Sequence, residues 1–262
     1  MTGIEGLHNF RDVGGIALAG GGAVRPGVLY RSDALQALTP RGVEELAASD
    51  IGVVVDFRTP EERAAAPDLL PADRAVRVVE MSILEGAMAQ MAKEAFAADA
   101  PPTPERMAEV AARIPTLDQL YVGMLQHGAD AFAAVARLVA ASTDDLPSAV
   151  LVHCTAGKDR TGVAVALLLS AAGAERAAVI SDYTASERNL AGEWADGMLQ
   201  MVAALGIPVT PEIQTLMVKT PPEAIRTALE WVDATHGSAA DYLRSGGLTD
   251  AELAALRRRL AG

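Results

Sequence analysis

A cysteine and an arginine six positions apart, Cys154 and Arg160, are the residues of this sequence best suited to catalysis. The polar stretch that contains them lies between two apolar runs, Ala149–Val152 and Thr161–Ala172. The first run is typical of a buried strand and the second of a buried helix, and α/β proteins bind ligands at such junctions. Backbone N–H groups of the loop and the N-terminus of the next helix would together form an anion site.

The residue types within this loop suit a bound phosphate and attack on its phosphorus. Gly157 supplies the backbone freedom that a tight loop around an anion needs. The Arg160 guanidinium can bind two oxygens of the anion at once. A cysteine in such an electropositive site ionises readily, and the thiolate is the nucleophilic form. The pattern therefore predicts nucleophilic displacement at phosphorus, with Cys154 as the nucleophile.

Other motifs fit this sequence less well. A Walker loop would place its first glycine where the sequence has Val152, and would have Ser or Thr in place of Asp159. A dinucleotide-binding fingerprint starting at Gly20 has Arg25 in place of its third glycine. A lone cysteine is more often a small buried apolar residue, but the spacing from Cys154 to the arginine favours the catalytic interpretation.

Composition narrows the possible partners. The chain has 262 residues, with 22 Lys and Arg against 34 Asp and Glu, so its formal net charge is −12. Scattered basic residues in an acidic chain argue against nucleic acid and anionic membranes. The longest uncharged apolar run, Thr161–Ala174, is shorter than the about 20 residues of a membrane-spanning helix, so no transmembrane segment is expected. We expect a cytoplasmic protein, and export by a route without a signal peptide stays open.

Strands and helices alternate over the first 170 residues, which predicts an α/β fold with a central, mostly parallel sheet flanked by helices. Expected strands are Val28–Tyr30, Ile51–Phe57, Ala75–Ile83 and Ala149–His153. Expected helices open at Thr39-Pro40 and cover Leu117–Ser142, Thr161–Ala172, Ala177–Leu205, Pro221–His236, Ala239–Arg244 and Thr249–Leu260. We expect one domain over 1–262. Residues 85–115 are predicted to be a helical insertion, either a lid over the site or an ordinary surface excursion.

The stretch His153–Gly162 is the Cys-x5-Arg signature, and the chain resembles the protein-tyrosine phosphatase superfamily, in particular its bacterial tyrosine/serine phosphatases. Matching stretches are Asn9–Gly15, Arg25–Ser32, Val55–Glu62, Ser181–Tyr183 and Gly237–Arg244. The resemblance implies a protein-tyrosine-phosphatase-like fold and a phosphomonoesterase that acts on phosphotyrosine in proteins, with tolerance for phosphoserine and phosphothreonine. It implies a phosphocysteine intermediate and no metal or other cofactor. A phosphoinositide or inositol-phosphate phosphatase using the same residues is the alternative.

The resemblance and the chemistry together assign roles around the loop. Phosphate is expected to bind to Thr155, Ala156, Gly157, Lys158, Asp159 and Arg160, and free phosphate or vanadate to occupy the same place. The leaving oxygen must be protonated by an acid. Asp56, at the end of a buried strand, matches the family's acid; it could instead pair with Arg58 or cap the following turn. Asp159 is the second candidate acid, or the residue that positions the attacking water.

Further side chains are expected to support the site. His153 would fix the base of the loop through hydrogen bonds. Thr161 would either donate a hydrogen bond to the Cys154 thiolate or cap the helix. Arg11 and Asp12 would form an ion pair that braces the loop, with a substrate contact as the alternative.

Positive side chains are also expected to add charge near the site. Lys158 is expected at the mouth of the loop, where it would favour phosphoinositides or simply be exposed to solvent. Arg31 and Arg58 are expected to raise the positive charge nearby. Rival classes fit less well: a sulfurtransferase loop lacks the Thr-Gly helix start, a thiol-redox arsenate reductase needs a second cysteine, and a phosphate-binding module needs no Cys154.

Overall fold

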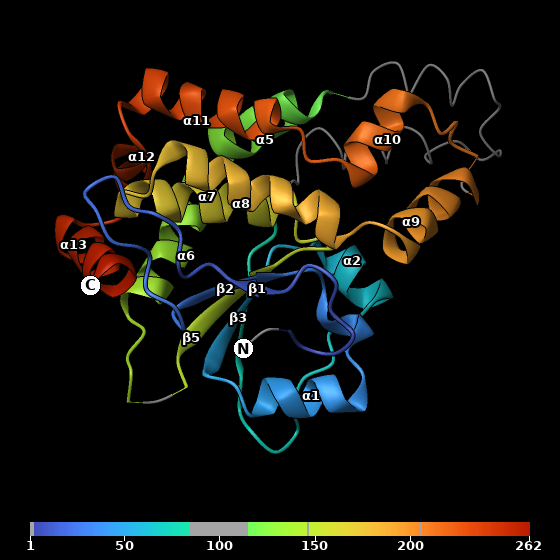
Figure 1. Cartoon of the computed structure of the whole chain (residues 1–262), viewed down its shortest axis with the longest axis horizontal. Helices are drawn as coiled ribbons and strands as arrows, with labels where there is room; N and C mark the ends of the chain where they lie inside the picture. Colours follow the sequence, from blue (N-terminus) through green and yellow to red (C-terminus); the bar gives the residue numbers. More distant parts are fainter. Residues whose placement is uncertain (1–2, 84–114, 146, 205) are drawn as a thin grey trace.

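The computed structural model describes residues 3–83, 115–145, 147–204 and 206–262 (Figure 1). Its sheet has five strands in the order β1-β2-β5-β3-β4. The strands are β1 (Arg11–Asp12), β2 (Leu29–Ser32), β3 (Ile51–Asp56), β4 (Arg77–Glu80) and β5 (Ala149–His153). All neighbouring pairs are parallel except β1 and β2, which are antiparallel. The predicted α/β fold with a mostly parallel sheet is therefore confirmed.

The central strands are short apolar runs because both of their faces are covered, as is usual in parallel sheets. Val150 and Val152 of β5 belong to one core cluster, while Leu151 belongs to the other. This alternation follows from the two-residue period of a strand. The carboxyl ends of three strands lie side by side, since Ser32 pairs with His153, and His153 with Asp56. Loops that leave these strands must meet at this edge.

Helices cover the two faces unequally. Figure 1 shows α7 and α8 over the sheet, α5 and α11 as an outer layer above them, and α1 on the opposite face. In chain order the helices up to residue 189 are the short 3-10 helix Leu35–Ala37, α1 (Pro40–Ala47), α2 (Pro60–Ala65), α5 (Leu117–His127), α6 (Ala129–Ala140), α7 (Arg160–Ala172) and α8 (Arg176–Asn189). Those that follow are α9 (Glu193–Ala204), α10 (Pro211–Val218), α11 (Pro222–His236), α12 (Ala239–Ser245) and α13 (Asp250–Ala261).

Helix α7 forms the predicted core helix. It starts at Arg160, at the end of the loop, and is almost fully buried. It ends at Gly173, whose φ of +92° closes the helix in the left-handed conformation that glycine favours. Gly162 lets α8 approach closely, because a Cβ there would lie 3.0 Å from the ring of Tyr183. The loop is therefore followed by a rigid helix that is packed on all sides.

Some elements differ from the predictions. The helix expected over Leu117–Ser142 is two helices, α5 and α6, which meet at Gly128. The helix expected over Ala177–Leu205 is likewise divided near Gly192, whose φ is +83°. The two-residue strand β1 and the helices α2 and α10 were not predicted. The insertion expected at 85–115 falls almost entirely outside the described residues, so its role as a lid stays a prediction, as does the single domain. Among the described helices, none combines the length and apolar character needed to cross a membrane.

Candidate active site

Residues 153–160, from the last residue of β5 to the first of α7, form a loop whose carbonyl groups accept hydrogen bonds from the surrounding structure. The backbone N–H of Ala34 donates to the Thr155 carbonyl at 3.1 Å, and the side-chain amide of Asn9 donates to the Ala156 carbonyl at 3.0 Å. Arg31 Nη2 donates to the Gly157 carbonyl at 2.7 Å. Because the C=O and N–H of a trans peptide point in opposite directions, the next three N–H groups point inward. Successive inward N–H groups form an anion-binding nest.

Gly157 is required at the turn of this loop. Its φ is +66°, and a Cβ would lie 2.1 Å from the backbone oxygen of Ser32. An L-residue would therefore be strained by its backbone and would also collide with the end of β2. The close approach is what allows β2 to support the loop. The predicted need for glycine at this position is confirmed.

The structure brings the two reactive residues together. Cys154 lies buried at the base of the loop, 2% exposed, and Arg160 stands at the first position of α7, 8% exposed. Burial alone would lower the pKa of Arg160, but its bonds to Glu62 and the charges of Cys154, Glu62 and Asp159 raise it above its usual value. The guanidinium therefore remains a fixed positive charge beside the sulfur.

Glu62 is a site residue that the sequence analysis missed. Its Oε2 accepts from Arg160 Nη1 at 2.6 Å and its Oε1 from Arg160 Nη2 at 2.7 Å. Thr155 Oγ1 also donates to Oε1 at 2.6 Å. Burial opposes ionisation, but the bonds and charge of Arg160, with those from Thr155 and Thr59, lower the pKa of Glu62 to about 2. The carboxylate is thus ionised at neutral pH and holds the guanidinium in one plane.

A local signal for Glu62 was present in the sequence. Thr59 caps α2 and forms a capping box with Glu62: the Glu62 N–H donates to Thr59 Oγ1 at 3.3 Å, and the Thr59 N–H donates to Glu62 Oε2 at 2.8 Å. Thr-Pro-Glu-Glu directly after a buried strand predicts this motif. Because β3 ends next to β5, the box places a carboxylate at the edge where the 153–160 loop begins.

Asp56 lies where the sequence predicts, at the end of β3, but its carboxylate is enclosed. It is 1% exposed. Its Oδ1 accepts from the Arg58 N–H at 2.8 Å, and its Oδ2 from Arg58 Nη2 at 2.8 Å. The alternative expected for Asp56, pairing with Arg58 and capping the turn, is the arrangement observed. A fully buried carboxylate bound to a guanidinium is poorly placed to exchange protons with a bound molecule.

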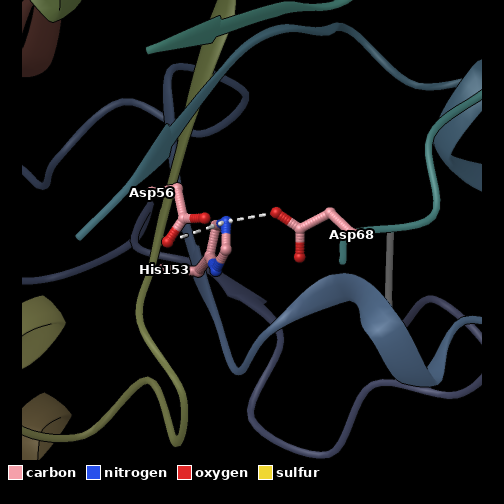
Figure 2. A group of neighbouring side chains, drawn as sticks. All are labelled: Asp56, Asp68 and His153. Atoms are coloured by element: carbon pink, nitrogen blue, oxygen red, sulfur yellow. Dashed lines mark ion pairs between the residues drawn. The ribbon is translucent and has the colours of Figure 1, made fainter. Parts of the chain in front are cut away.

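His153, the last residue of β5, lies beside two carboxylates (Figure 2). Its Nε2 is 3.2 Å from Asp68 Oδ2 and 3.9 Å from Asp56 Oδ1, and its Nδ1 is 3.3 Å from the Cys154 carbonyl. These contacts suit the predicted role at the base of the loop, which stays a prediction. Burial of the Asp68 carboxylate would raise its pKa, but the contacts with His153 and the charge of Arg58 outweigh burial and lower the pKa of Asp68.

His153, Asp56 and Asp68 are also residue types that can bind a metal, with ligand atoms within 4.8 Å of one another. Arg58 Nη2, however, lies 2.8 Å from Oδ2 of Asp56 and 2.8 Å from Oδ2 of Asp68. The guanidinium already neutralises both carboxylates and would repel a cation held beside it. This group therefore does not fit a metal ion.

Asp159 is the more accessible carboxylate of the loop. Its side chain is 25% exposed. Its Oδ1 accepts from Lys158 Nζ at 2.8 Å and from the Tyr121 hydroxyl at 2.6 Å. Within the described residues, the hydrogen bonds to this side chain all involve Oδ1, so Oδ2 is available to a bound molecule.

Lys158 does not stand at the mouth of the loop, so the expectation of a solvent-exposed side chain was wrong, while a preference for phosphoinositides stays a prediction. It is 1% exposed, and its Nζ donates to the carbonyl of Leu216 at 2.8 Å and of Lys219 at 3.3 Å, besides Asp159. These carbonyls lie at the C-terminal end of α10, which carries partial negative charge and attracts a cation. Lys158 therefore connects the loop to α10.

Arg11 and Asp12 do not form the predicted ion pair. Arg11 Nε binds Asp182 at 2.7 Å, whereas Asp12 accepts from the N–H groups of Gly14 and Gly27 at 2.8 and 2.7 Å. The physical reason is that consecutive residues of a strand point to opposite faces. Arg11 Nη1 also donates to Asn9 Oδ1 at 2.6 Å, so Arg11 holds the residue whose amide binds the Ala156 carbonyl.

Arg58 does not add free positive charge, contrary to expectation, whereas Arg31 shares the single carboxylate of Asp182 with Arg11. Arg31 Nη1 pairs with Asp182 at 2.6 Å, and Arg31 is fully buried. Arg58 is neutralised by Asp56 and Asp68. Burial favours such pairing, since an unpaired buried charge is costly. The two arginines serve the structure of the loop.

Thr161 forms neither of the hydrogen bonds considered for it. Its hydroxyl is fully buried, with no hydrogen-bond partner within the described ranges. The helix start at Asp159 likewise has no side-chain cap. The hydroxyl is thus available to a group that enters the loop or to an ionised Cys154.

A loop of inward N–H groups that contains a buried cysteine and ends at a paired arginine defines a Cys-x5-Arg site at the carboxyl edge of a parallel sheet. The sequence model described as the tyrosine phosphatase family matches residues 2–262. The chain therefore belongs to the tyrosine phosphatase family, and its class is that of the protein-tyrosine phosphatases. The resemblance inferred from the motifs is confirmed.

Relatives with assigned names support the same class. A Cupriavidus necator protein with a provisional tyrosine-protein phosphatase name is 31% identical over 239 residues, 91% of this chain and 81% of the relative. The triple specificity protein phosphatase PtpB of Mycobacterium tuberculosis is 28% identical over 99% of this chain and 98% of its own. A Nostoc commune tyrosine-protein phosphatase is 32% identical over 66% of this chain and 53% of the relative.

Proposed function

We propose that this protein hydrolyses phosphotyrosine in proteins, and phosphoserine and phosphothreonine more slowly, through a phosphocysteine intermediate. The observation that carries the proposal is the 153–160 loop itself, whose carbonyls of Thr155, Ala156 and Gly157 are all bound from outside. The inward N–H groups are thereby fixed before a substrate arrives. Such preorganised donors stabilise the charge of a phosphoryl group without further rearrangement.

In the first step the Cys154 thiolate attacks phosphorus. The S–P bond forms while the bond from phosphorus to the ester oxygen breaks, and Asp159 gives its proton to that oxygen. Arg160 and the loop N–H groups bind the three remaining phosphate oxygens. In the second step a water attacks phosphorus, the S–P bond breaks, and the water's proton returns to Asp159. Phosphate and the thiolate are released, and no metal is required.

Asp159 is preferred to Asp56 as the acid on two grounds. Its side chain is partly exposed, and its Oδ2 faces no described protein donor. Asp56 is enclosed by Arg58, and protonating it would break a buried ion pair. Glu62 has the separate task of orienting Arg160.

Phosphoproteins are the preferred substrate class. The names of the relatives describe protein phosphatases, one of them of triple specificity. The phosphoinositide alternative depended on a free Lys158, and that ammonium is bound to α10 and Asp159. A second phosphate on an inositol ring would therefore lack this partner.

The substitution Cys154→Ser tests the proposal. Turnover of p-nitrophenyl phosphate and of a phosphotyrosyl peptide should fall by at least about 10⁴-fold, because the hydroxyl is a far weaker nucleophile. Binding of phosphate or vanadate, measured by calorimetry, should persist because the loop is unchanged. Turnover close to that of the wild type would refute the covalent mechanism. Loss of both turnover and phosphate binding in a folded variant would refute the assignment of the loop as the phosphate site.

A further inference from the structure

We propose that Tyr121, supported by Tyr183, is a positioning residue that holds the Asp159 carboxylate so that Oδ2 exchanges the proton with the substrate. This inference rests on the proposed function and deepens it. The carrying observation is a chain of two short hydrogen bonds that ends on the carboxylate.

The direction of both hydrogen bonds follows from the groups involved. The Tyr121 hydroxyl is 2.6 Å from Asp159 Oδ1 and 2.8 Å from the Tyr183 hydroxyl. A phenol has a single proton to donate, and a carboxyl oxygen that carries no proton can only accept. Tyr121 therefore donates to Asp159, and Tyr183 donates to Tyr121. Each bond polarises the next in a buried environment, which strengthens both.

The chain also selects one of the two carboxylate oxygens. Tyr121 and Lys158 both donate to Oδ1, so a rotation of the carboxylate would break two hydrogen bonds at once. With Oδ1 occupied, the proton that is given to a leaving group must be carried by Oδ2. Protonation of Oδ2 leaves both bonds intact, since the other oxygen of a carboxylic acid still accepts.

Tyr121 is suited to a permanent donor role. Burial and the charge of Asp159 raise the pKa of Tyr121 well above its usual value, so its proton stays in place at neutral pH. Burial likewise raises the pKa of Tyr183. The charged groups around this chain are Lys158 and Arg160 of the loop, together with Arg31 on β2 and Glu187 on α8.

Packing fixes the two tyrosines in place. Their rings meet edge to face, with centroids 5.9 Å apart and planes at 87°. Both side chains are fully buried, Tyr121 on α5 and Tyr183 on α8. Gly162 of α7 provides the space for the Tyr183 ring. Three helices thus define where the Tyr121 hydroxyl meets the loop.

Tyr121→Phe tests the inference through its dependence on the leaving group. If Tyr121 positions the acid, kcat for phenyl phosphate, a poor leaving group, should fall about 10–100-fold, and kcat for p-nitrophenyl phosphate only a few-fold. Tyr242→Phe is the matched control, because that buried hydroxyl donates at 2.8 Å to the Leu125 carbonyl. It should show no such difference. Equal losses on both substrates in Tyr121→Phe, or no loss, would overturn the positioning role.

A double-mutant cycle supplies an independent readout. With Asp159→Asn as background, removal of the Tyr121 hydroxyl should cause little further loss on phenyl phosphate, since the acid is already absent. Additive losses would show that Tyr121 acts elsewhere. If Tyr121→Phe fails to fold, Tyr183→Phe replaces it, with a smaller leaving-group difference expected and its absence counting against the proposal. Failure of the wild type to hydrolyse either ester would instead overturn the proposed function.

Discussion

The carboxylate of Glu62 and the guanidinium of Arg160 form a two-bonded pair, in which Nη1 donates to Oε2 at 2.6 Å and Nη2 donates to Oε1 at 2.7 Å. Arg160 Nη1 also donates to the Phe57 carbonyl at 3.2 Å. These bonds occupy one edge of the planar guanidinium. Within the described contacts the Nε–H of Arg160 has no protein acceptor. The edge of the guanidinium that carries Nε is therefore free to bind a phosphate oxygen. Glu62 thereby converts a flexible side chain into an oriented one.

Glu62→Gln should lower kcat/KM on a phosphotyrosyl peptide about 10–100-fold. Hydrogen bonds to charged groups contribute about 1.5–3 kcal/mol, and about 1.4 kcal/mol corresponds to a factor of ten. The neutral amide cannot hold Arg160 with two accepting oxygens. Glu223→Gln is the control, since its ion pair with Arg226 is exposed. Unchanged kcat/KM in Glu62→Gln would show that Arg160 is oriented by the loop alone.

The pH dependence of stability offers a second test of Glu62. Its pKa is lowered from 4.5 to about 2 in the folded protein. A lowered carboxylate pKa stabilises the folded state fully above the unfolded value, and this stabilisation is lost as the pH falls toward the folded value. The difference in Tm between wild type and Glu62→Gln should therefore be constant above about pH 5 and narrow between 4.5 and 2. Calorimetry at several pH values measures it; a difference that widens on acidification would contradict the pairing.

Asp159→Asn and Asp56→Asn should have different consequences. The first should reduce kcat about 10²–10⁴-fold on phenyl phosphate and far less on p-nitrophenyl phosphate. Its Tm should fall less than that of Asp56→Asn, because an amide oxygen can still accept from Tyr121 and Lys158. The second breaks a buried ion pair with Arg58 and should destabilise the fold by about 3–5 kcal/mol. Its activity loss at low temperature should be similar for both esters. The reverse pattern would restore Asp56 as the acid.

Lys158→Met should loosen α10 rather than change substrate preference. The substitution removes the donor to the Leu216 carbonyl and to Asp159. Unsatisfied buried acceptors cost about 1–3 kcal/mol. Hydrogen exchange over α10 should accelerate at least about tenfold, while Lys219→Met, which loses only an exposed pair with Glu187, should not match it. Unchanged exchange with a selective loss of phosphoinositide turnover would instead support the charge role first expected of Lys158.

Features of the fold and the site could be predicted from the sequence where they depend on residues close together in the chain. The loop, its strand and its helix were predicted because the spacing from Cys154 to Arg160 and the two apolar runs lie within a few residues of one another. The strand order was not predictable in detail, since β1 has two residues and no periodicity. The division of one expected helix into α5 and α6 at Gly128 was also missed, because the helical periodicity of the sequence continues through this position.

The partners of buried charges were the least predictable feature. Arg11 pairs with Asp182, which is 171 positions away, and the sequence suggested its neighbour Asp12 instead. Lys158 binds carbonyls of a helix that was not predicted. Such contacts depend on which distant segments the fold brings together, and burial then selects the pairing. Motif positions were therefore predicted well, but the roles of their charged side chains were not.

Gly157→Ala should abolish activity, and Gly173→Ala is the matched control. Both glycines have positive φ, +66° and +92°, so each alanine costs about 1–2 kcal/mol of backbone strain. Only at Gly157 does the new Cβ also collide, 2.1 Å from the Ser32 oxygen, whereas nothing lies within 4 Å at Gly173. The collision must displace the loop and misdirect its N–H groups. Gly157→Ala should therefore lose phosphate binding and turnover, measured by calorimetry and peptide kinetics, while Gly173→Ala keeps both at a lower Tm. Equal activity in the two variants would mean that the fixed loop geometry is not what binds phosphate.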